Sequence, residues 1–139
     1  MIYTSHSEAE TERIGAELAV TLAAGDVVAL FGDLGAGKTA FCRGLARGMG
    51  ITQRVTSPTF TIVNEYTENA AAQPLFHFDM YRLGGSDELF ELGFDDYVER
   101  GGIVAVEWSE RIADALPPTA ITVKITHAGE NERTIEVIR

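Results

Sequence analysis

Hydrophobic and polar residues recur along the chain with two periods, one typical of helices and one typical of strands. The helical period predicts a helix over residues 7–23, in which Ser7 and Glu10 have the spacing of a capping box. Its apolar stripe consists of Ile14, Leu18 and Leu22. Because the other side is rich in glutamate, we expect this helix to pack one face on a core and expose the other.

Six further segments have the composition or the alternation of strands. They are residues 27–31, 60–66, 74–78, 103–106, 121–125 and 135–137. The unbroken apolar runs at 27–31 and 103–106 are typical of strands buried in a parallel sheet. The polar residues 67–73 form the expected tip between the second and third segments. The last two segments flank Gly129 and Glu130, which predicts a closing antiparallel hairpin.

Apolar residues at every fourth position predict a second helix, which follows Lys38 and ends at Gly50. Gly44 and Gly48 lie inside it, and each costs about 1 kcal/mol relative to alanine in a helix. We therefore expect this helix to pack closely against a neighbouring element. A shorter helix is expected over residues 86–92.

The turn between the first strand and the second helix carries a phosphate-binding pattern. Its sequence is Gly32-Asp33-Leu34-Gly35-Ala36-Gly37-Lys38-Thr39, which fits G-x-x-x-x-G-K-[ST], the P-loop or Walker A motif. A strand, a glycine loop and a helix together turn backbone N–H groups toward a phosphate. Lys38 supplies a charge for the β- and γ-phosphates, and the Thr39 hydroxyl is placed to bind Mg²⁺. A chance glycine turn is the alternative, and the flanking strand and helix weigh against it.

Composition narrows the class of protein. The 139 residues suit one domain, and an apolar content of 45% indicates a globular chain. No apolar run is long enough to span a bilayer, the N-terminus lacks a signal-peptide pattern and Cys42 is the single cysteine, so we expect a cytoplasmic protein. The net charge of −10 argues against autonomous nucleic-acid binding, so any role in RNA metabolism would require a partner.

Two acidic residues follow strand-like runs. Asp79 comes after residues 74–78, where a carboxylate can hold Mg²⁺ or orient water, and it can equally cap the following turn. Glu107 comes after residues 103–106, and four apolar residues followed by an acid is the Walker B layout. Glu107 can instead pair with an arginine or cap a helix near Ser109, but the P-loop favours the metal role.

Other features bear on the nucleotide and on the surface. The chain lacks the Asn-Lys-x-Asp pattern by which guanine-specific P-loop proteins read the base, so adenine is favoured. It also lacks an arginine-rich insertion that would clamp a second phosphorylated substrate, which argues against a small-molecule kinase. Residues 87–99 contain six acidic and no basic side chains, a pattern that favours a solvated face over a docking surface.

Four ordered blocks of this sequence together resemble the TsaE (YjeE) family of bacterial P-loop ATPases. They are the loop at residues 32–39, Ser57-Pro58-Thr59-Phe60, His77-Phe78-Asp79-Met80-Tyr81-Arg82 and Val106-Glu107-Trp108. The resemblance extends from Thr11 and Gly15 to the terminal hairpin. It implies a single α/β P-loop NTPase domain over residues 1–139, with a mixed, mostly parallel sheet flanked by helices and a C-terminal antiparallel hairpin.

The resemblance also implies a function and a set of site residues. Family members use ATP and Mg²⁺ to support N6-threonylcarbamoyladenosine modification of tRNA position 37, acting with the TsaD–TsaB pair. The expected nucleotide ligands are Gly32, Asp33, Leu34, Gly35, Ala36, Gly37, Lys38, Thr39 and Ala40, with Glu8, Thr11 and Arg133 as candidate adenine contacts. The expected catalytic residues are Lys38, Asp79 and Glu107, and the expected metal-site residues are Thr39, Glu107 and Asp79.

The roles of the two acids stay open at this point. Our hypothesis puts Glu107 on the metal and Asp79 on the attacking water or on a metal-bound water, and the reverse is the alternative. Ser57-Pro58-Thr59 is either a loop that senses the γ-phosphate or a plain strand entry. Two rival functions are a small-molecule kinase and a non-hydrolysing ATP-dependent protein that docks through residues 87–99.

Overall fold

A computed structural model describes residues 1–32, 37–52, 55, 63–66, 74–79, 91, 93–107 and 116–139. The elements in chain order are β1 (Ile2–Ser5), α1 (Glu8–Ala19), β2 (Val27–Phe31), α2 (Lys38–Gly48), β3 (Val63–Tyr66), β4 (Leu75–Asp79), α4 (Phe94–Glu99), β5 (Ile103–Glu107), β6 (Ile121–His127) and β7 (Arg133–Ile138). No helix within these described ranges combines the length and the apolar character needed to cross a membrane.

The strands form one sheet of seven in the order β1-β7-β6-β2-β5-β4-β3. Its centre is parallel, because β2 pairs in parallel with β5 and β6, and β4 pairs in parallel with β5. Both edges are antiparallel: β3 pairs with β4 on one side, and β6, β7 and β1 follow one another on the other. This arrangement confirms the predicted mixed α/β fold and its C-terminal hairpin. The carboxyl ends of the four parallel strands meet at one edge of the sheet.

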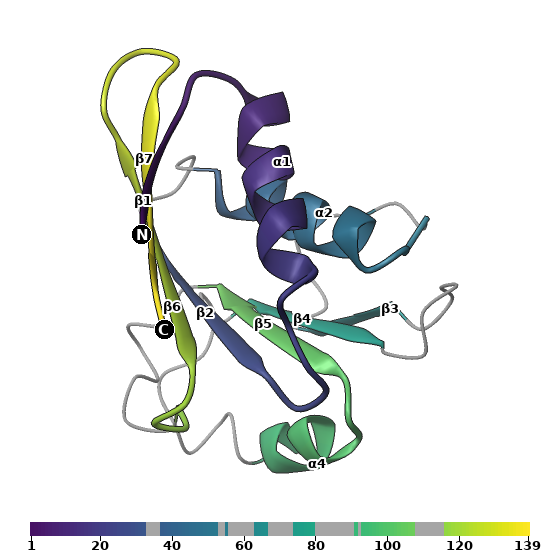
Figure 1. Cartoon of the computed structure of the whole chain (residues 1–139). Helices are drawn as coiled ribbons and strands as arrows, with labels where there is room; N and C mark the ends of the chain where they lie inside the picture. Colours follow the sequence, from purple (N-terminus) through teal and green to yellow (C-terminus); the bar gives the residue numbers. More distant parts are fainter. Residues whose placement is uncertain are drawn as a thin grey trace.

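Helices cover both faces of this sheet, as Figure 1 shows: α1 and α2 lie on one face and α4 lies on the other. Successive residues of a strand point to opposite faces. In β2, Val28 and Leu30 accordingly belong to the core under α1 and α2, and Val27 belongs to the core that includes Phe94 of α4. Burial on both faces explains why β2 and β5 are unbroken apolar runs.

Helices α1 and α2 cross at glycines. A Cβ atom on Gly44 would lie 2.0 Å from the main-chain oxygen of Glu12, and one on Gly15 would lie 2.4 Å from that of Phe41. A Cβ on Gly48 would lie 2.6 Å from the main-chain oxygen of Ala16. These separations confirm the close approach predicted from the helical glycines. The contact packs α2 closely against α1 from Phe41 to Gly48.

The first helix differs from its prediction at both ends. The Ser7 side chain accepts a hydrogen bond from the Glu10 N–H at 3.1 Å, as expected for a cap. The Glu10 carboxylate, however, accepts from the backbone N–H of His6 at 2.7 Å, which replaces the reciprocal half of the capping box. The helix ends at Ala19 and not near residue 23, because the following N–H groups form tighter bonds to carbonyls three residues back.

Two elements were missed, and several predictions lie outside the described residues. Strand β1 and helix α4 are short, and neither has a distinctive local pattern. Within the acidic run, Asp95, Asp96 and Glu99 are exposed on α4, which agrees with a solvated face. The predictions outside the described residues concern 33–36, the 57–59 loop, 60–62, the 67–73 tip, most of the 86–92 helix and the segment that follows Glu107.

Candidate functional site

The expected phosphate-binding residues lie where β2 ends and α2 begins. Gly37 caps α2 with φ +109°, a conformation that favours glycine, and the first helical hydrogen bond runs from Phe41 N–H to Gly37 O at 2.9 Å. The N–H groups of residues 37–40, which precede Phe41, therefore lack helical acceptors. Lys38 is buried, and its Nζ donates to the Gly32 carbonyl at 2.6 Å. Asp33, Leu34, Gly35 and Ala36 lie outside the described residues.

The two predicted acids lie side by side at the same edge of the sheet. Asp79 ends β4, Glu107 ends β5, and the two are Cα partners in the parallel register. Their side chains therefore project from the same face, the one covered by α2, and only 4% of Asp79 and 3% of Glu107 is exposed. Their roles in catalysis and metal binding stay predictions, but the fold brings them together.

A buried histidine contacts one of these acids. His77 lies two residues before Asp79 in β4, and its Nε2 is hydrogen-bonded to Glu107 Oε2. Cys42, one helical turn after Lys38, completes a cluster in which one ligand atom from each of Cys42, His77 and Glu107 lies within 4.8 Å of the others. All three residues are buried, so this cluster lies between α2 and the sheet.

A pocket of about 410 Å³ opens beside the start of α2. Its lining residues are His6, Ser7, Glu8, Thr11, Gly37, Ala40, Asn131 and Arg133. The fold thus gathers Glu8, Thr11 and Arg133, the three candidate adenine contacts, around one cavity with the end of the phosphate loop. Their binding role stays a prediction. His6, Ser7 and Asn131 were not predicted, because only the meeting of α1 with the β6–β7 turn brings them to this pocket.

The chemical groups at this site are suitable for binding a nucleotide together with Mg²⁺. The amino end of α2 offers N–H groups without helical acceptors, which is what a phosphate binds. Asp79 and Glu107 offer neighbouring carboxylate oxygens, the ligands that Mg²⁺ takes in proteins. Thr39, half-buried at the second position of α2, is on the same edge of the sheet. Two buried acids at partner positions also favour a cation near them.

The pKa of the Cys42 thiol makes stability depend on pH, and this dependence tests whether the thiol is shielded from solvent in the cluster. Burial, and then the negative charge of Glu107, raise that pKa well above its ordinary value of 9.0. Above about pH 9 the unfolded thiol ionises and the folded one does not, so the free energy of unfolding falls as the pH rises.

We expect chemical denaturation of wild-type and Cys42→Ala protein to reveal this difference. The stability advantage of the wild type over Cys42→Ala should shrink between pH 7 and pH 10, by about 1.4 kcal/mol for each unit above the unfolded pKa. Parallel stability profiles for the two proteins would show that Cys42 is not enclosed in this way.

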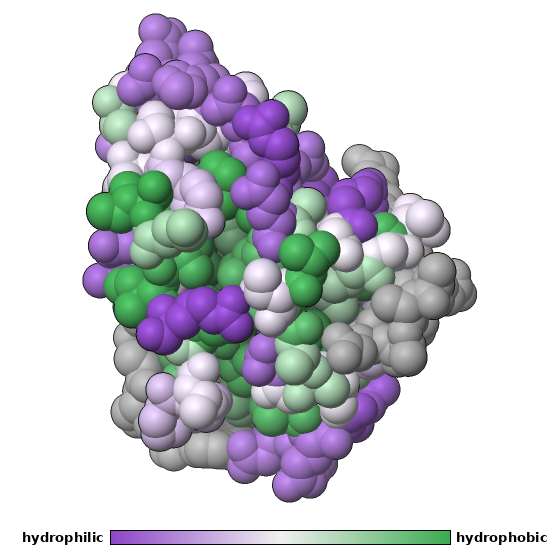
Figure 2. All heavy atoms as spheres, in the orientation of Figure 1, coloured by the Kyte–Doolittle hydropathy of each residue, from purple (hydrophilic) through white to green (hydrophobic). Residues whose placement is uncertain are grey.

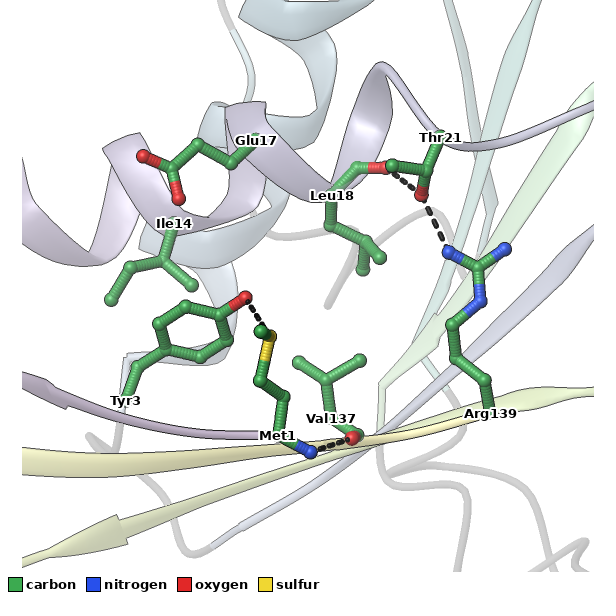
Figure 3. A pocket seen from close by; sticks show the side chains of 8 residues that line it. All are labelled: Met1, Tyr3, Ile14, Glu17, Leu18, Thr21, Val137 and Arg139. Carbon is green, nitrogen blue, oxygen red and sulfur yellow. Dashed lines mark hydrogen bonds between the residues drawn. The ribbon is translucent and has the colours of Figure 1, made fainter.

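A second pocket lies away from the strand ends. It has a volume of about 350 Å³ between α1 and the strands β1 and β7, with Ile14 and Leu18 on one side and Tyr3 and Val137 on the other (Figure 3). Figure 2 shows hydrophobic side chains gathered on the face where both chain ends lie. The Arg139 guanidinium donates to Thr21 Oγ1 at 2.6 Å at its rim. Glu17 also lines this pocket, whereas Gly37 and Ala40 at the start of α2 line the first one.

Comparisons with known proteins agree with the geometry. The sequence model of the family described as threonylcarbamoyl adenosine biosynthesis protein TsaE matches residues 5–135. Curated proteins named tRNA threonylcarbamoyladenosine biosynthesis protein TsaE are similar to this chain. The relative from Bacillus subtilis is 46% identical over 91% of this chain and 77% of its own length. The relative from Treponema pallidum is 38% identical over 96% of each chain.

A solved structure has the same fold. The crystal structure of Bacillus subtilis YdiB superposes with a TM-score of 0.82 at 39% identity, covering 97% of this chain and 82% of its own. An identity of 39% means that the two proteins are similar in amino-acid sequence as well as in fold. The fold of this chain is therefore shared with a protein of known structure.

Proposed function

This chain belongs to the TsaE family of threonylcarbamoyladenosine biosynthesis proteins, and we propose that it is a Mg²⁺-dependent ATPase that supports this tRNA modification. The observation that carries the proposal is the meeting of three side chains at one sheet edge. Buried Lys38 starts α2, and buried Asp79 and Glu107 end neighbouring parallel strands on the face that α2 covers.

The proposed division of labour follows from what each group can do. The N–H groups at the start of α2 and the Lys38 ammonium offset the negative charge of the phosphates. Glu107 and the Thr39 hydroxyl would hold the metal, and Asp79 would orient the attacking water. The chemistry supplied by a bound Mg²⁺ is neutralisation of charge on the β- and γ-phosphate oxygens.

The 410 Å³ pocket supports adenosine binding beside the phosphate site. It is adjacent to Gly37 and Ala40, so a base lying in it would be within the length of one nucleotide from the loop. We propose that Thr11 and Arg133 contact the adenine or ribose, with Glu8 at the rim. Glu8 is exposed and lies 3.6 Å from Arg43, so its contribution is the smallest of the three.

We propose further that the chain acts with TsaD and TsaB and reaches tRNA only through them. The net charge of −10 supports this indirect route, because phosphate contacts supply much of the affinity for nucleic acid. An ATPase that needs partners to complete its site would be slow alone.

Phosphate release from ATP, measured with and without TsaD–TsaB, tests the proposal. We expect Mg²⁺-dependent release that rises with the partner proteins, and weaker binding of GTP than of ATP. In ATP titrations with and without Mg²⁺, Glu107→Gln should lose at least about tenfold of the Mg²⁺ effect on ATP affinity. Asp79→Asn should keep the Mg²⁺ effect on ATP affinity and lose phosphate release.

Other outcomes identify the rival functions. Tight ATP binding without release under any partner condition would indicate a docking protein. Consumption of ATP that requires an added hydroxylated metabolite would indicate a small-molecule kinase. If Asp79→Asn loses the Mg²⁺ effect and Glu107→Gln keeps it, the roles of the two acids are reversed.

A further inference from the structure

The proposed mechanism assigns no role to the buried side chain of His77. His77 has no solvent exposure, although it lies in the middle of β4 among apolar neighbours. Its Nε2 is hydrogen-bonded to Glu107 Oε2, and its Nδ1 has no partner among the residues that the structure describes. A buried polar atom without a hydrogen bond destabilises a fold. An aliphatic residue would avoid that cost, so the imidazole calls for an explanation.

The register of the sheet explains why His77 reaches Glu107. The Cα partner of His77 in β5 is Ala105, whose small side chain leaves the space beside it open toward the strand end. Glu107 lies two residues further on the same face, so its carboxylate is the diagonal neighbour of the ring. Cys42 of α2 bounds the same cluster. The glutamate is thus held between a helix and a strand.

We propose that His77 is a positioning residue, which holds Glu107 Oε2 through its Nε2–H and so fixes the orientation of the carboxylate assigned to Mg²⁺. A glutamate side chain has three rotatable bonds, and a hydrogen bond to one oxygen fixes the last of them. The other oxygen, Oε1, then has a defined direction before any ligand binds. Hydrogen-bond partners of this kind commonly change metal affinity or activity about 10- to 100-fold when they are removed.

Cys42 is buried in the same cluster, with its Sγ within 4.8 Å of a ring nitrogen of His77 and a carboxylate oxygen of Glu107. The inference about His77 rests on the proposed function, since it assumes that Glu107 acts on the metal.

Two amide substitutions provide a matched test. The side-chain nitrogen of His77→Gln can reach the position of Nε2, whereas that of His77→Asn corresponds to the position of Nδ1. The readout is the ratio of ATP affinities with and without Mg²⁺, measured with a fluorescent ATP analogue. We expect His77→Gln to keep this ratio within about threefold of the wild type, and His77→Asn to lower it about 10- to 100-fold.

A purely structural role predicts a different result. Both variants would then lower the melting temperature and leave the Mg²⁺ ratio unchanged, and that result would overturn the proposal. A double-mutant cycle adds a second criterion: in the Glu107→Gln background, His77→Asn should cause no further loss of the ratio. An equal loss in both backgrounds would show that His77 does not act through Glu107.

Two further measurements use the wild-type protein, so they do not depend on whether a variant folds. Nitrogen chemical shifts of the His77 ring should show a proton on Nε2, and a ring protonated only on Nδ1 would overturn the proposal. Stoichiometric zinc held by Cys42, His77 and Glu107 would overturn it as well, because His77 would then be a ligand itself. If the wild type shows no Mg²⁺ effect on ATP binding, the proposed function itself is wrong. The His77 proposal alone is wrong if the wild type shows this effect and His77→Asn keeps it.

Discussion

Lys38→Ala abolishes Mg²⁺-ATP-dependent phosphate release, with an expected loss of at least about 10²- to 10³-fold. The reason is the position of the ammonium group: it is buried at the start of α2 and donates to the Gly32 carbonyl at 2.6 Å, so it is held at the phosphate loop. Alanine leaves the N–H groups of α2 in place and removes the positive charge of the Lys38 side chain. Phosphate release and ATP affinity are the measurements.

The control for this variant is Lys124→Ala. The chain has two lysines, and Lys124 is exposed on β6, so both substitutions change the net charge equally. Lys124→Ala should keep release and affinity within about twofold of the wild type, since exposed charges interact weakly. If Lys38→Ala retained wild-type phosphate release, the loop would not be a phosphate site and the proposed ATPase would be wrong.

Gly44→Ala lowers the free energy of unfolding by about 3 kcal/mol, the largest stability effect that we expect from a single methyl group. Helix propensity alone favours alanine by about 1 kcal/mol. Packing reverses the sign, because the new Cβ would lie 2.0 Å from the Glu12 main-chain oxygen and 2.7 Å from its carbonyl carbon. These are backbone atoms of α1, so the clash is relieved only if the two helices separate. Chemical denaturation measures the change.

Gly129→Ala is the matched control, because its added Cβ would approach no atom closer than 3.6 Å. We expect its free energy of unfolding to stay within about 0.5 kcal/mol of the wild type. Separation of α1 from α2 should also weaken ATP binding by Gly44→Ala, since α1 and α2 both line the 410 Å³ pocket. A Gly44→Ala protein as stable as the wild type would show that the helices cross elsewhere.

Features with strong local signals were predicted correctly. The apolar run at Val27–Phe31 and the start of α2 lie on either side of the glycine turn in the sequence, and each satisfies its own pattern. The closing hairpin of β6 and β7 was also predicted, because alternation and turn residues act over a few positions. Helical glycines indicated a close approach, but the sequence did not say that α1 was the neighbour.

The errors concern features that depend on distant neighbours. Strand β1 has four residues and is stabilised by pairing with β7, more than 100 residues later in the chain. Helix α4 has six residues, too few for a stable isolated helix, and its Phe94 is buried against Phe78 of β4. In each case the tertiary contact supplies the stability, so the local sequence carries little signal.

The sequence by itself predicted a phosphate loop, and it determined the elements on either side of that turn and the acids that end two strands, because these depend on residues close together in the chain. Only the tertiary structure decided that β4 pairs with β5, which makes Asp79 the partner of Glu107 and brings His77 against the same carboxylate. It likewise gathered the ends of α1, α2 and the β6–β7 turn around one pocket. Strand order and helix docking follow from burial of apolar surface across the whole chain, and no short segment encodes them.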